Sequence, residues 1–391
     1  MSPVRPGPDD RELRARYLTE VLATLYPPAG TGPVAEFVAV PNARKPRLLV
    51  PTGSRRVAAA AVRRYARPAA RAARLKRDLA ALALRTGADR ALLRDRISVS
   101  GTDTIESHLR RVLDREVAVS VHIGPARANR KPVLQLLSPD GCTVGFAKLG
   151  TNPLTRRLVR AETVALTAVG HARLSTVVVP RVLYAGRWHG HEVLVQEALP
   201  AWRPRKAVAA TLPAAMREVA TALGVYPVRL AASPYRKALD QRLSTLDCPE
   251  LAGALSRLTD RRGDTVLEFG SWHGDWAPWN MAEQSDNVLL WDWERFTPGV
   301  PVGFDAVHHA LQVRLERRED AGAAVDATVL RAPELLAPFG ATPGAAEVTA
   351  LLHLVDLAAR YLADRQAEAG ARLGFLGTWL LPVLVRRVGE L

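Results

Sequence analysis

The sequence predicts an α+β fold in which a small antiparallel sheet precedes a mainly helical C-terminal half. Short apolar or alternating runs follow one another between residues 117 and 197, and Asp140-Gly141 is a tight-turn signal between two of them. Beyond Pro200 the apolar residues recur mostly with helical spacing. We therefore expect three parts, namely a basic N-terminal α+β extension (1–100), a strand-rich part (101–200) and a helical part (201–391).

The elements follow in order along the chain. The N-terminal extension carries helix-like patterns with two short extended runs between them, at residues 9–26, 37–40, 47–50 and 54–85. The middle part carries three strands, a helix and a hairpin, at residues 117–123, 132–137, 143–149, 155–172, 182–184 and 192–197. We expect the C-terminal helices near residues 205–225, 233–246, 248–260, 304–318, 344–367 and 373–389, interrupted by an irregular section at 264–303.

The composition is that of an ordinary globular protein, with 48% hydrophobic and 24% charged residues in 391. The first twenty residues lack the apolar core of a secretory signal, and no stretch approaches the roughly 18 apolar residues that span a bilayer. We therefore expect a cytoplasmic location. Cys142 and Cys248 lie far apart without metal-type spacing, so neither a disulfide framework nor a zinc site is indicated.

The formal charge of +15 predicts an anionic ligand, such as a nucleotide, a phosphorylated substrate or a membrane surface. Residues 55–96 are especially basic, and Pro68 is expected to break or kink the helix there. Two interpretations of this segment remain open: a solvated basic face, and a docking surface for an anionic membrane or an acidic partner. Nucleic acid is disfavoured because no interleaved aromatic residues or recognisable binding motif accompany the charge.

The strongest chemical signal is the run His273-Gly274-Asp275-Trp276-Ala277-Pro278-Trp279-Asn280, followed by an apolar strand that ends at Asp292. Phosphoryl transfer to a hydroxyl needs a carboxylate that orients and deprotonates the acceptor, and oxygen ligands that hold magnesium against the phosphates. Asp275 is the candidate base, and Asn280 and Asp292 are the candidate ligands. In the alternative interpretation Asp275 caps a turn and Asn280 begins a helix.

This segment resembles the catalytic and metal-binding motifs of the aminoglycoside phosphotransferase family, within the protein-kinase-like superfamily. The resemblance covers about residues 115–370. It implies a bilobal protein-kinase-like fold with a small antiparallel-sheet N-lobe and a helical C-lobe. It also implies ATP and Mg²⁺ as cofactors, Asp275 as catalytic base, Asn280 and Asp292 as magnesium ligands, and His273 as the residue that holds the loop. A further Asp usually braces this loop in the family, which implies that role for Asp305.

The resemblance also implies a lysine that anchors the phosphates, with a helix carboxylate as its partner. Lys148 lies on the third strand of the predicted sheet and Glu162 in the next helix, where a carboxylate can hold the ammonium in place. Three arginines compete for Glu162, at positions 156, 157 and 160.

Two backbone segments are expected to contact the nucleotide. The loop from Gly124 to Lys131 occupies the position of a nucleotide-covering loop, where backbone N–H groups and Arg130 or Lys131 would meet the phosphates; a plain basic hairpin is the alternative. Glu197 and Leu199 occupy the position of the interlobe linker, whose backbone pairs with the adenine edge in this family.

Five of the eight tryptophans crowd around the motif, at positions 272, 276, 279, 291 and 293. They pack the core, or Trp276 or Trp279 forms a wall beside the acceptor hydroxyl. A protein-kinase interpretation is disfavoured because Trp293-Glu294 stands where Phe-Gly would follow the metal Asp, and no activation segment is recognisable.

The sequence therefore predicts ATP-dependent transfer of the γ-phosphate to a hydroxyl of a small molecule, a sugar or an antibiotic-like compound. A +15 chain does not favour a polycationic antibiotic as the acceptor. Two alternatives stay open: a non-catalytic nucleotide-binding scaffold of kinase shape, and a kinase acting on a peptide or a glycan in a biosynthetic pathway.

Overall fold

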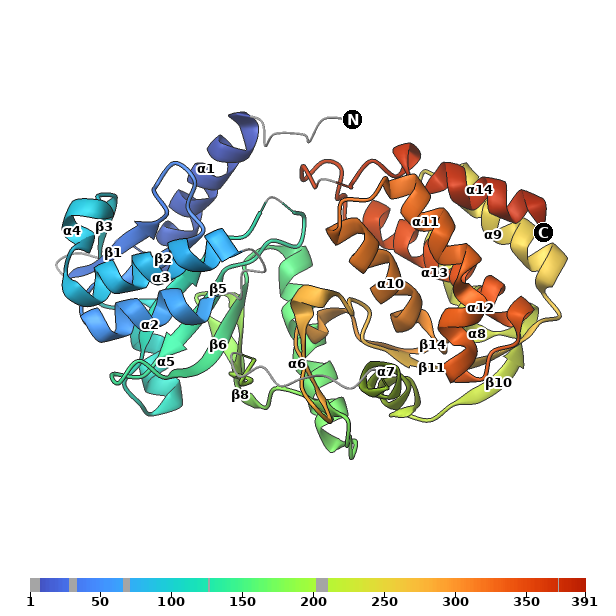
Figure 1. The fold of residues 1–391 in the computed structure, drawn as a ribbon, viewed down its shortest axis with the longest axis horizontal. Helices are drawn as coiled ribbons and strands as arrows, with labels where there is room; N and C mark the ends of the chain where they lie inside the picture. The colour runs from blue at the N-terminus through green and yellow to red at the C-terminus, as the bar shows by residue number, and fades with distance from the viewer. Residues whose placement is uncertain (1–7, 28–33, 66–70, 126, 202–209, 372) are drawn as a thin grey trace. The chain divides into compact units, whose positions relative to one another are not determined.

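The computed structural model describes residues 8–27, 34–65, 71–125, 127–201, 210–371 and 373–391. The chain divides into two compact units. The first comprises Met1–Arg160 and Arg181–Ala198, and the second comprises Ala161–Pro180 and Leu199–Leu391. In Figure 1 the chain is coloured from blue at its N-terminus to red at its C-terminus.

The first unit is built on an eight-stranded antiparallel sheet with the order β3-β1-β2-β4-β5-β6-β9-β8. Its strands are β1 (Val34–Val40), β2 (Leu48–Pro51), β3 (Arg96–Ser100), β4 (Ala118–His122), β5 (Val133–Leu137), β6 (Thr143–Gly150), β8 (Val182–Trp188) and β9 (His191–Glu197). Successive side chains of a strand point to opposite faces, and β2 illustrates this: Leu49 belongs to one apolar cluster, and Leu48 and Val50 to another.

Different helices supply these two clusters (Figure 1). The helices of this part of the chain are α1 (Pro8–Leu25), α2 (Arg55–Tyr65), α3 (Arg71–Thr86), α4 (Asp89–Leu92), α5 (Ile105–Leu113) and α6 (Pro153–His171), the last of which continues into the second unit. Residues of α1 and α5 pack with Leu49, whereas residues of α2 and α3 pack with Leu48 and Val50. Both faces of the sheet are therefore covered.

The second unit is mainly helical, with two three-stranded sheets. Its helices are α7 (Thr211–Thr221), α8 (Pro234–Leu243), α9 (Pro249–Arg262), α10 (Phe304–Glu316), α11 (Ala321–Leu330), α12 (Ala332–Leu336), α13 (Pro343–Ala363) and α14 (Leu381–Glu390). One sheet has the order β10-β11-β14 (Tyr226–Arg229, Val266–Trp272, Thr297–Pro301), and the other has the order β12-β13-β7 (Met281–Glu283, Val288–Leu290, Val177–Val178).

Helix α13 is the central core helix of this unit, and most of its residues are buried. Among the described residues, no single helix is long and apolar enough to cross a membrane. The pair Ala332–Phe339 and Pro343–Ala363 meets the length and composition test together, but it is bent by 106°.

The predicted α+β class, with an antiparallel sheet followed by a helical half, is confirmed. The predicted helix at 54–85 is two helices, α2 and α3, and Pro68 lies outside the described residues. Strand β3 and the helices α5, α11 and α12 were not predicted. The helix expected near 205–225 begins at Thr211 in the described part of the chain.

The boundary expected at residue 100 does not separate two units of the structure. Strand β2 of the expected extension pairs with β4, with Leu48 opposite His122 and Leu49 opposite Val121. Backbone hydrogen bonds thus join β1–β3 to the strands expected to form a separate N-lobe. Strands β1–β3 complete that sheet, and the first unit extends through both parts.

Candidate functional site

A short hairpin brings Asn280 and Asp292 to the same end of the β12–β13 ladder. Met281 pairs with Leu290 across the hairpin, and just beyond that pair the Trp291 N–H donates to the Asn280 carbonyl at 3.0 Å. Asn280 directly precedes β12 and Asp292 follows Trp291. The hairpin therefore brings Asn280 and Asp292, which are twelve residues apart in the sequence, close together in space.

The loop before this hairpin is held by Asp305, at the start of α10. The carboxylate of Asp305 accepts hydrogen bonds from the backbone N–H groups of His273 at 2.7 Å and of Gly274 at 3.1 Å. Burial raises the pKa of Asp305 to about 7, although these two donors act in the opposite direction. The contacts supply the bracing role that the resemblance implies for Asp305.

His273 is buried and links the loop to the strand before Asp292. Its Nδ1 accepts from the Asp275 N–H at 3.3 Å, and its Nε2 lies 3.2 Å from the Trp291 carbonyl. Burial lowers the pKa of His273 to about 4, so the ring is neutral at pH 7 and donates through Nε2. These two contacts connect the loop to the strand before Asp292, and the loop-holding role expected for His273 stays a prediction.

The backbone conformation and the close packing at residue 274 require a glycine. Its φ is 86°, and a Cβ at this position would lie 2.3 Å from the carbonyl oxygen of Arg295. The Gly274 carbonyl in turn accepts a hydrogen bond from the Arg360 guanidinium on α13. The turn that presents Asp275 is thus fixed from two sides.

The Asp275 carboxylate is hydrogen-bonded on both oxygens while its side chain remains 31% exposed. Oδ1 lies 3.2 Å from His308 Nε2, and Oδ2 accepts from Asn280 Nδ2 at 2.9 Å. Burial opposes ionisation, but the hydrogen bond from His308 and the positive charge of Arg360 outweigh it and hold the pKa of Asp275 below its usual value. The group is a carboxylate with access to solvent, as a base needs. Sequence reasoning missed His308, because the sequence does not show which side of α10 meets the loop.

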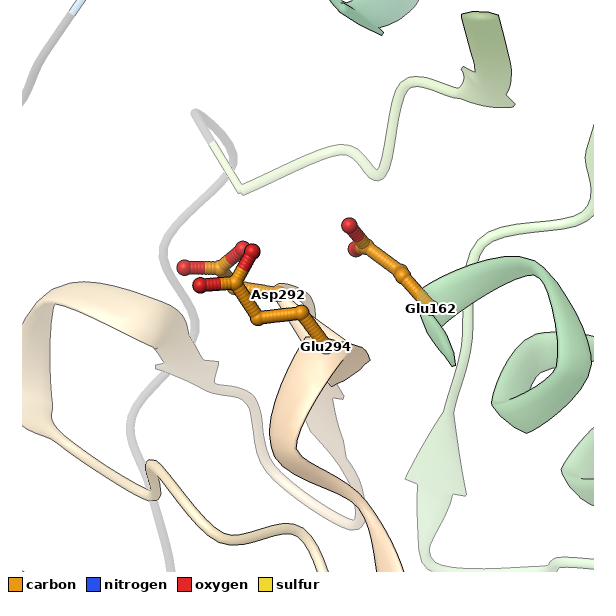
Figure 2. A group of neighbouring side chains, drawn as sticks. All are labelled: Glu162, Asp292 and Glu294. Carbon is orange, nitrogen blue, oxygen red and sulfur yellow. The ribbon is translucent and has the colours of Figure 1, made fainter. Parts of the chain in front are cut away.

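Three carboxylates of the second unit can hold a cation (Figure 2). One ligand atom each from Glu162, Asp292 and Glu294 lies within 4.8 Å of the others. Asp292 has a left-handed backbone with φ 72°, a conformation that a non-glycine residue adopts at a cost. Asn280 uses its amide nitrogen on Asp275, so its Oδ1 is the atom available to a cation. An all-oxygen donor set of this kind fits Mg²⁺.

The positions of Glu162 and Glu294 add to the predicted ligand set. Glu162 accepts from the Trp293 N–H at 3.2 Å, on the turn that follows Asp292. Glu294 stands two residues after Asp292, and this spacing was the one sequence signal that could have indicated Glu294 as a cation ligand. The predicted partner of Glu162, Lys148, belongs to the first unit, so their pairing stays a prediction.

Lys148 lies within β6, between Val133 of β5 and Leu194 of β9, and is only 5% exposed. A lysine on a strand is usually solvent-facing, and a buried ammonium requires partners. Its burial therefore argues against a simple surface role.

The remaining predicted nucleotide contacts also belong to defined places in the fold. Gly124 and Lys131 lie in the loop between β4 and β5, of which residue 126 is outside the described residues. In this loop the guanidinium of Arg130 lies 3.7 Å from the centre of the Tyr17 ring of α1. Arg130, a candidate phosphate contact, thus has an aromatic partner that sequence reasoning did not anticipate.

The expected linker coincides with a passage of the chain between the units. Glu197 ends β9 and pairs with Arg181 at 2.8 Å. The first unit ends at Ala198, and Leu199 begins the long C-terminal part of the second. The expected adenine contacts of Glu197 and Leu199 stay predictions.

Most of the tryptophans near the motif pack the core, and one of them is exposed enough to stand beside an acceptor. Trp272, Trp276 and Trp293 are buried, and the Trp276 indole N–H donates to the Met281 sulfur at 3.2 Å. Trp279 is 44% exposed. Trp276 is therefore a core residue, and Trp279 is the one of the two that can contact an acceptor.

No family model matches the sequence, and no curated protein matches it. The chain is similar to the solved structure of a thermostable mutant of aminoglycoside phosphotransferase APH(4)-Ia in complex with ADP and hygromycin B, at 14% identity over 72% of this chain and 98% of that one, with a TM-score of 0.46. It is also similar to spectinomycin phosphotransferase in complex with ADP and spectinomycin, at 8% identity over 73% and 98% of the chains and a TM-score of 0.41.

A choline/ethanolamine kinase family protein from Mesorhizobium loti matches at 14% identity over 66% of this chain and 90% of that one, with a TM-score of 0.38. All three TM-scores lie below 0.5. The likeness therefore carries no functional conclusion, and the function is inferred from the residues of this chain.

Proposed function

We propose that the chain is an ATP-dependent phosphotransferase that moves the γ-phosphate to a hydroxyl of a small molecule or glycan. The observation that carries the proposal is the contact between Asp275 and Asn280, at 2.9 Å, on the same hairpin end as Asp292. A partly exposed carboxylate next to a set of oxygen ligands is the minimum that phosphoryl transfer requires.

In this proposal Asp275 receives the proton of the acceptor hydroxyl. Oδ2 accepts a hydrogen bond from the Asn280 amide and Oδ1 one from His308, which fixes the plane of the carboxylate. The ionised state of Asp275 leaves lone pairs free to orient the attacking oxygen.

Asn280, Asp292 and Glu294 would hold Mg²⁺, with Glu162 within reach of the two carboxylates. Bound there, the ion would neutralise charge on the transferring phosphoryl group. Lys148 is proposed to contact the α- and β-phosphates, which its buried ammonium can do as a point charge.

The exposed ring of Trp279, one residue before Asn280, supports a planar apolar or sugar-like acceptor. A ring at this point of the loop can stack on a sugar while the hydroxyl approaches Asp275. The test is transfer of labelled phosphate from ATP to a panel of sugars and small alcohols, with Mg²⁺ and with a chelator. Magnesium-dependent labelling of an acceptor supports the proposal. Tight Mg-ATP binding without transfer to any acceptor, peptide or glycan would favour the scaffold alternative.

A second proposal concerns the basic segment 55–96: helix α3 docks on an anionic membrane surface. Leu75, Leu79 and Leu82 are 61%, 55% and 51% exposed, and their spacing places them on one stripe of the helix. The buried residues Ala81 and Leu84 lie on the opposite side. Exposed basic residues flank the stripe, at Arg74, Lys76 and Arg85. An apolar stripe with basic flanks is complementary to an anionic lipid surface.

Co-sedimentation with vesicles of phosphatidylcholine alone, and with added phosphatidylserine, tests this docking. We expect binding that needs phosphatidylserine and is lost in the variant Leu75→Ser/Leu79→Ser/Leu82→Ser. Leu330→Ser on α11, where the leucine is also 61% exposed, is the matched control. Equal binding by the triple variant, or a dimer that the triple substitution dissolves, would overturn the membrane assignment.

A further inference from the structure

A chain of two histidines lies behind Asp275 in the second unit. His308 Nε2 is 3.2 Å from Asp275 Oδ1, and His308 Nδ1 is 3.2 Å from His353 Nε2. His308 comes from α10 and His353 from α13, and both rings are fully buried. The phosphotransfer chemistry proposed above does not by itself require either histidine.

The surroundings of the pair are aromatic and tightly packed. The rings of Trp272 and Phe304 contact His353 edge to face, with centroids 5.9 Å and 5.6 Å away. Among the described residues, His353 Nδ1 has no hydrogen-bond partner. A second proton on His353 would thus place an unsatisfied N–H in the core, which is costly.

The electrostatic surroundings also keep the two rings neutral. Burial lowers the pKa of His308, and the positive Arg360 on α13 lowers it further, whereas the hydrogen bond to Asp275 and the negative charge of that carboxylate raise it. Burial, His308 and Arg360 together lower the pKa of His353. The other charged group on this part of α10, Asp305, is occupied by the loop N–H groups.

One proton arrangement satisfies all three groups. The carboxylate of Asp275 can only accept, so His308 must carry its proton on Nε2. A neutral His308 then has a bare Nδ1, which needs a donor, and His353 supplies it through Nε2–H. His353 Nδ1 is left as the bare nitrogen, in agreement with its lack of a partner. Reversing the tautomers would aim a lone pair of His308 at the carboxylate.

We propose that His308 and His353 are positioning residues: His353 locks the tautomer of His308, and His308 thereby holds Asp275 in the geometry that receives the acceptor proton. This inference rests on the proposed role of Asp275 as the base. In a Ser-His-Asp triad a carboxylate fixes the tautomer of the imidazole that acts as base. Here the roles are exchanged, because an imidazole positions the carboxylate that is the proposed base.

The tautomers can be tested without any substrate. Long-range ¹H–¹⁵N spectra of the histidine side chains at neutral pH are expected to show His308 and His353 as neutral rings protonated on Nε2. His308→Gln and His353→Gln assign the two signals, and the exposed His171, changed to Gln, is the control. A charged His308, or a His308 protonated on Nδ1 alone, would overturn the proposal.

Kinetic measurements on two variants then distinguish the loss of the His353 hydrogen-bond donor from a loss of packing at this position. His353→Leu removes the donor at similar volume, and we expect a fall in kcat of roughly 10–100-fold, as for other residues that orient a functional group, with the KM for nucleotide unchanged. His353→Gln retains a side-chain donor and should recover most of the rate. In His353→Leu the bare Nδ1 of His308 loses its donor, so the side-chain signals of His308 are expected to move from their wild-type positions.

The outcomes distinguish this inference from the proposed function. If His353→Leu keeps both the wild-type kcat and the wild-type His308 tautomer, the positioning role is wrong while the phosphotransferase proposal stands. If His353→Leu does not fold, the spectra of the wild-type protein still decide the tautomers. If Asp275→Asn retains full transfer, the proposed function fails whatever tautomers the spectra show.

Discussion

The proposed catalytic segment of the second unit (residues 273–305) and the α2–α3 surface of the first unit use polar and charged residues in opposite ways. In the catalytic segment the side chains of His273, Asp275 and Asp305 all have hydrogen-bond partners within the protein. On α3, Arg74, Lys76 and Arg85 are exposed, and exposed leucines stand between them. The first region therefore fixes individual atoms, whereas the second offers a surface whose effect depends on summed charge and apolar area.

If the catalytic segment works through fixed atoms, removing a single ligand should have a large effect on transfer. In Asp292→Asn the Mg²⁺ concentration that gives half-maximal transfer is expected to rise about 10–100-fold, because the substitution removes a charged oxygen from the cation site. Magnesium titration of the transfer rate measures this effect. Asp264→Asn is the matched control, because the Asp264 side chain is 97% exposed and lies on the α9–β11 connection. An unchanged magnesium titration in Asp292→Asn would show that Asp292 is not a ligand of the cation.

The backbone of the loop should be equally intolerant of change. Gly274→Ala combines φ 86° with a Cβ only 2.3 Å from the Arg295 carbonyl oxygen, whereas Gly224→Ala has φ 93° and open space around the new atom. We expect Gly224→Ala to lower the free energy of unfolding by about 1–2 kcal/mol. Gly274→Ala should cost about 1–3 kcal/mol more, because the clash adds to the strain. Chemical denaturation compares the two, and equal losses would show that the loop relaxes freely.

Burial of His273 predicts a pH dependence of stability. Its pKa is lowered from 6.5 to about 4 in the folded protein, so between these values the unfolded chain binds more protons. The free energy of unfolding therefore gains a contribution of up to roughly 3 kcal/mol as pH rises from 4 to 6.5, and loses it as pH falls. In His273→Gln this part of the pH dependence should disappear. Parallel pH profiles for the two proteins would contradict the neutral, buried state of His273.

On the α3 surface a single substitution should hardly change stability. Leu79→Ser, at a 55% exposed position, is expected to change the free energy of unfolding by less than about 0.5 kcal/mol. Leu84→Ala on the buried side of the same helix should cost about 2–5 kcal/mol. Thermal or chemical denaturation of both variants measures the contrast. A large loss in Leu79→Ser would mean that the stripe packs against the protein itself.

Much of this organisation could be predicted from local sequence. The strand-and-helix order of the middle part and the positions of Asp275, Asn280 and Asp292 follow from periodicity and spacing, since a hairpin between Asn280 and Asp292 is a local structure. The pairing of β2 with β4 joins residues 48 and 122, and no local pattern announces a contact so distant along the chain. For the same reason His308 and His353 were missed, because His308 reaches Asp275 from α10 and His353 reaches His308 from α13.

The proposal that Asp275 is the catalytic base is tested most directly by Asp275→Asn. Transfer from Mg-ATP to an acceptor found with the wild-type protein should fall about 10²–10⁴-fold, the range in which general base catalysis contributes. Nucleotide affinity and the unfolding midpoint should remain near those of the wild type, which separates loss of the base from loss of the fold. Transfer by Asp275→Asn at the wild-type rate would contradict the assignment of Asp275.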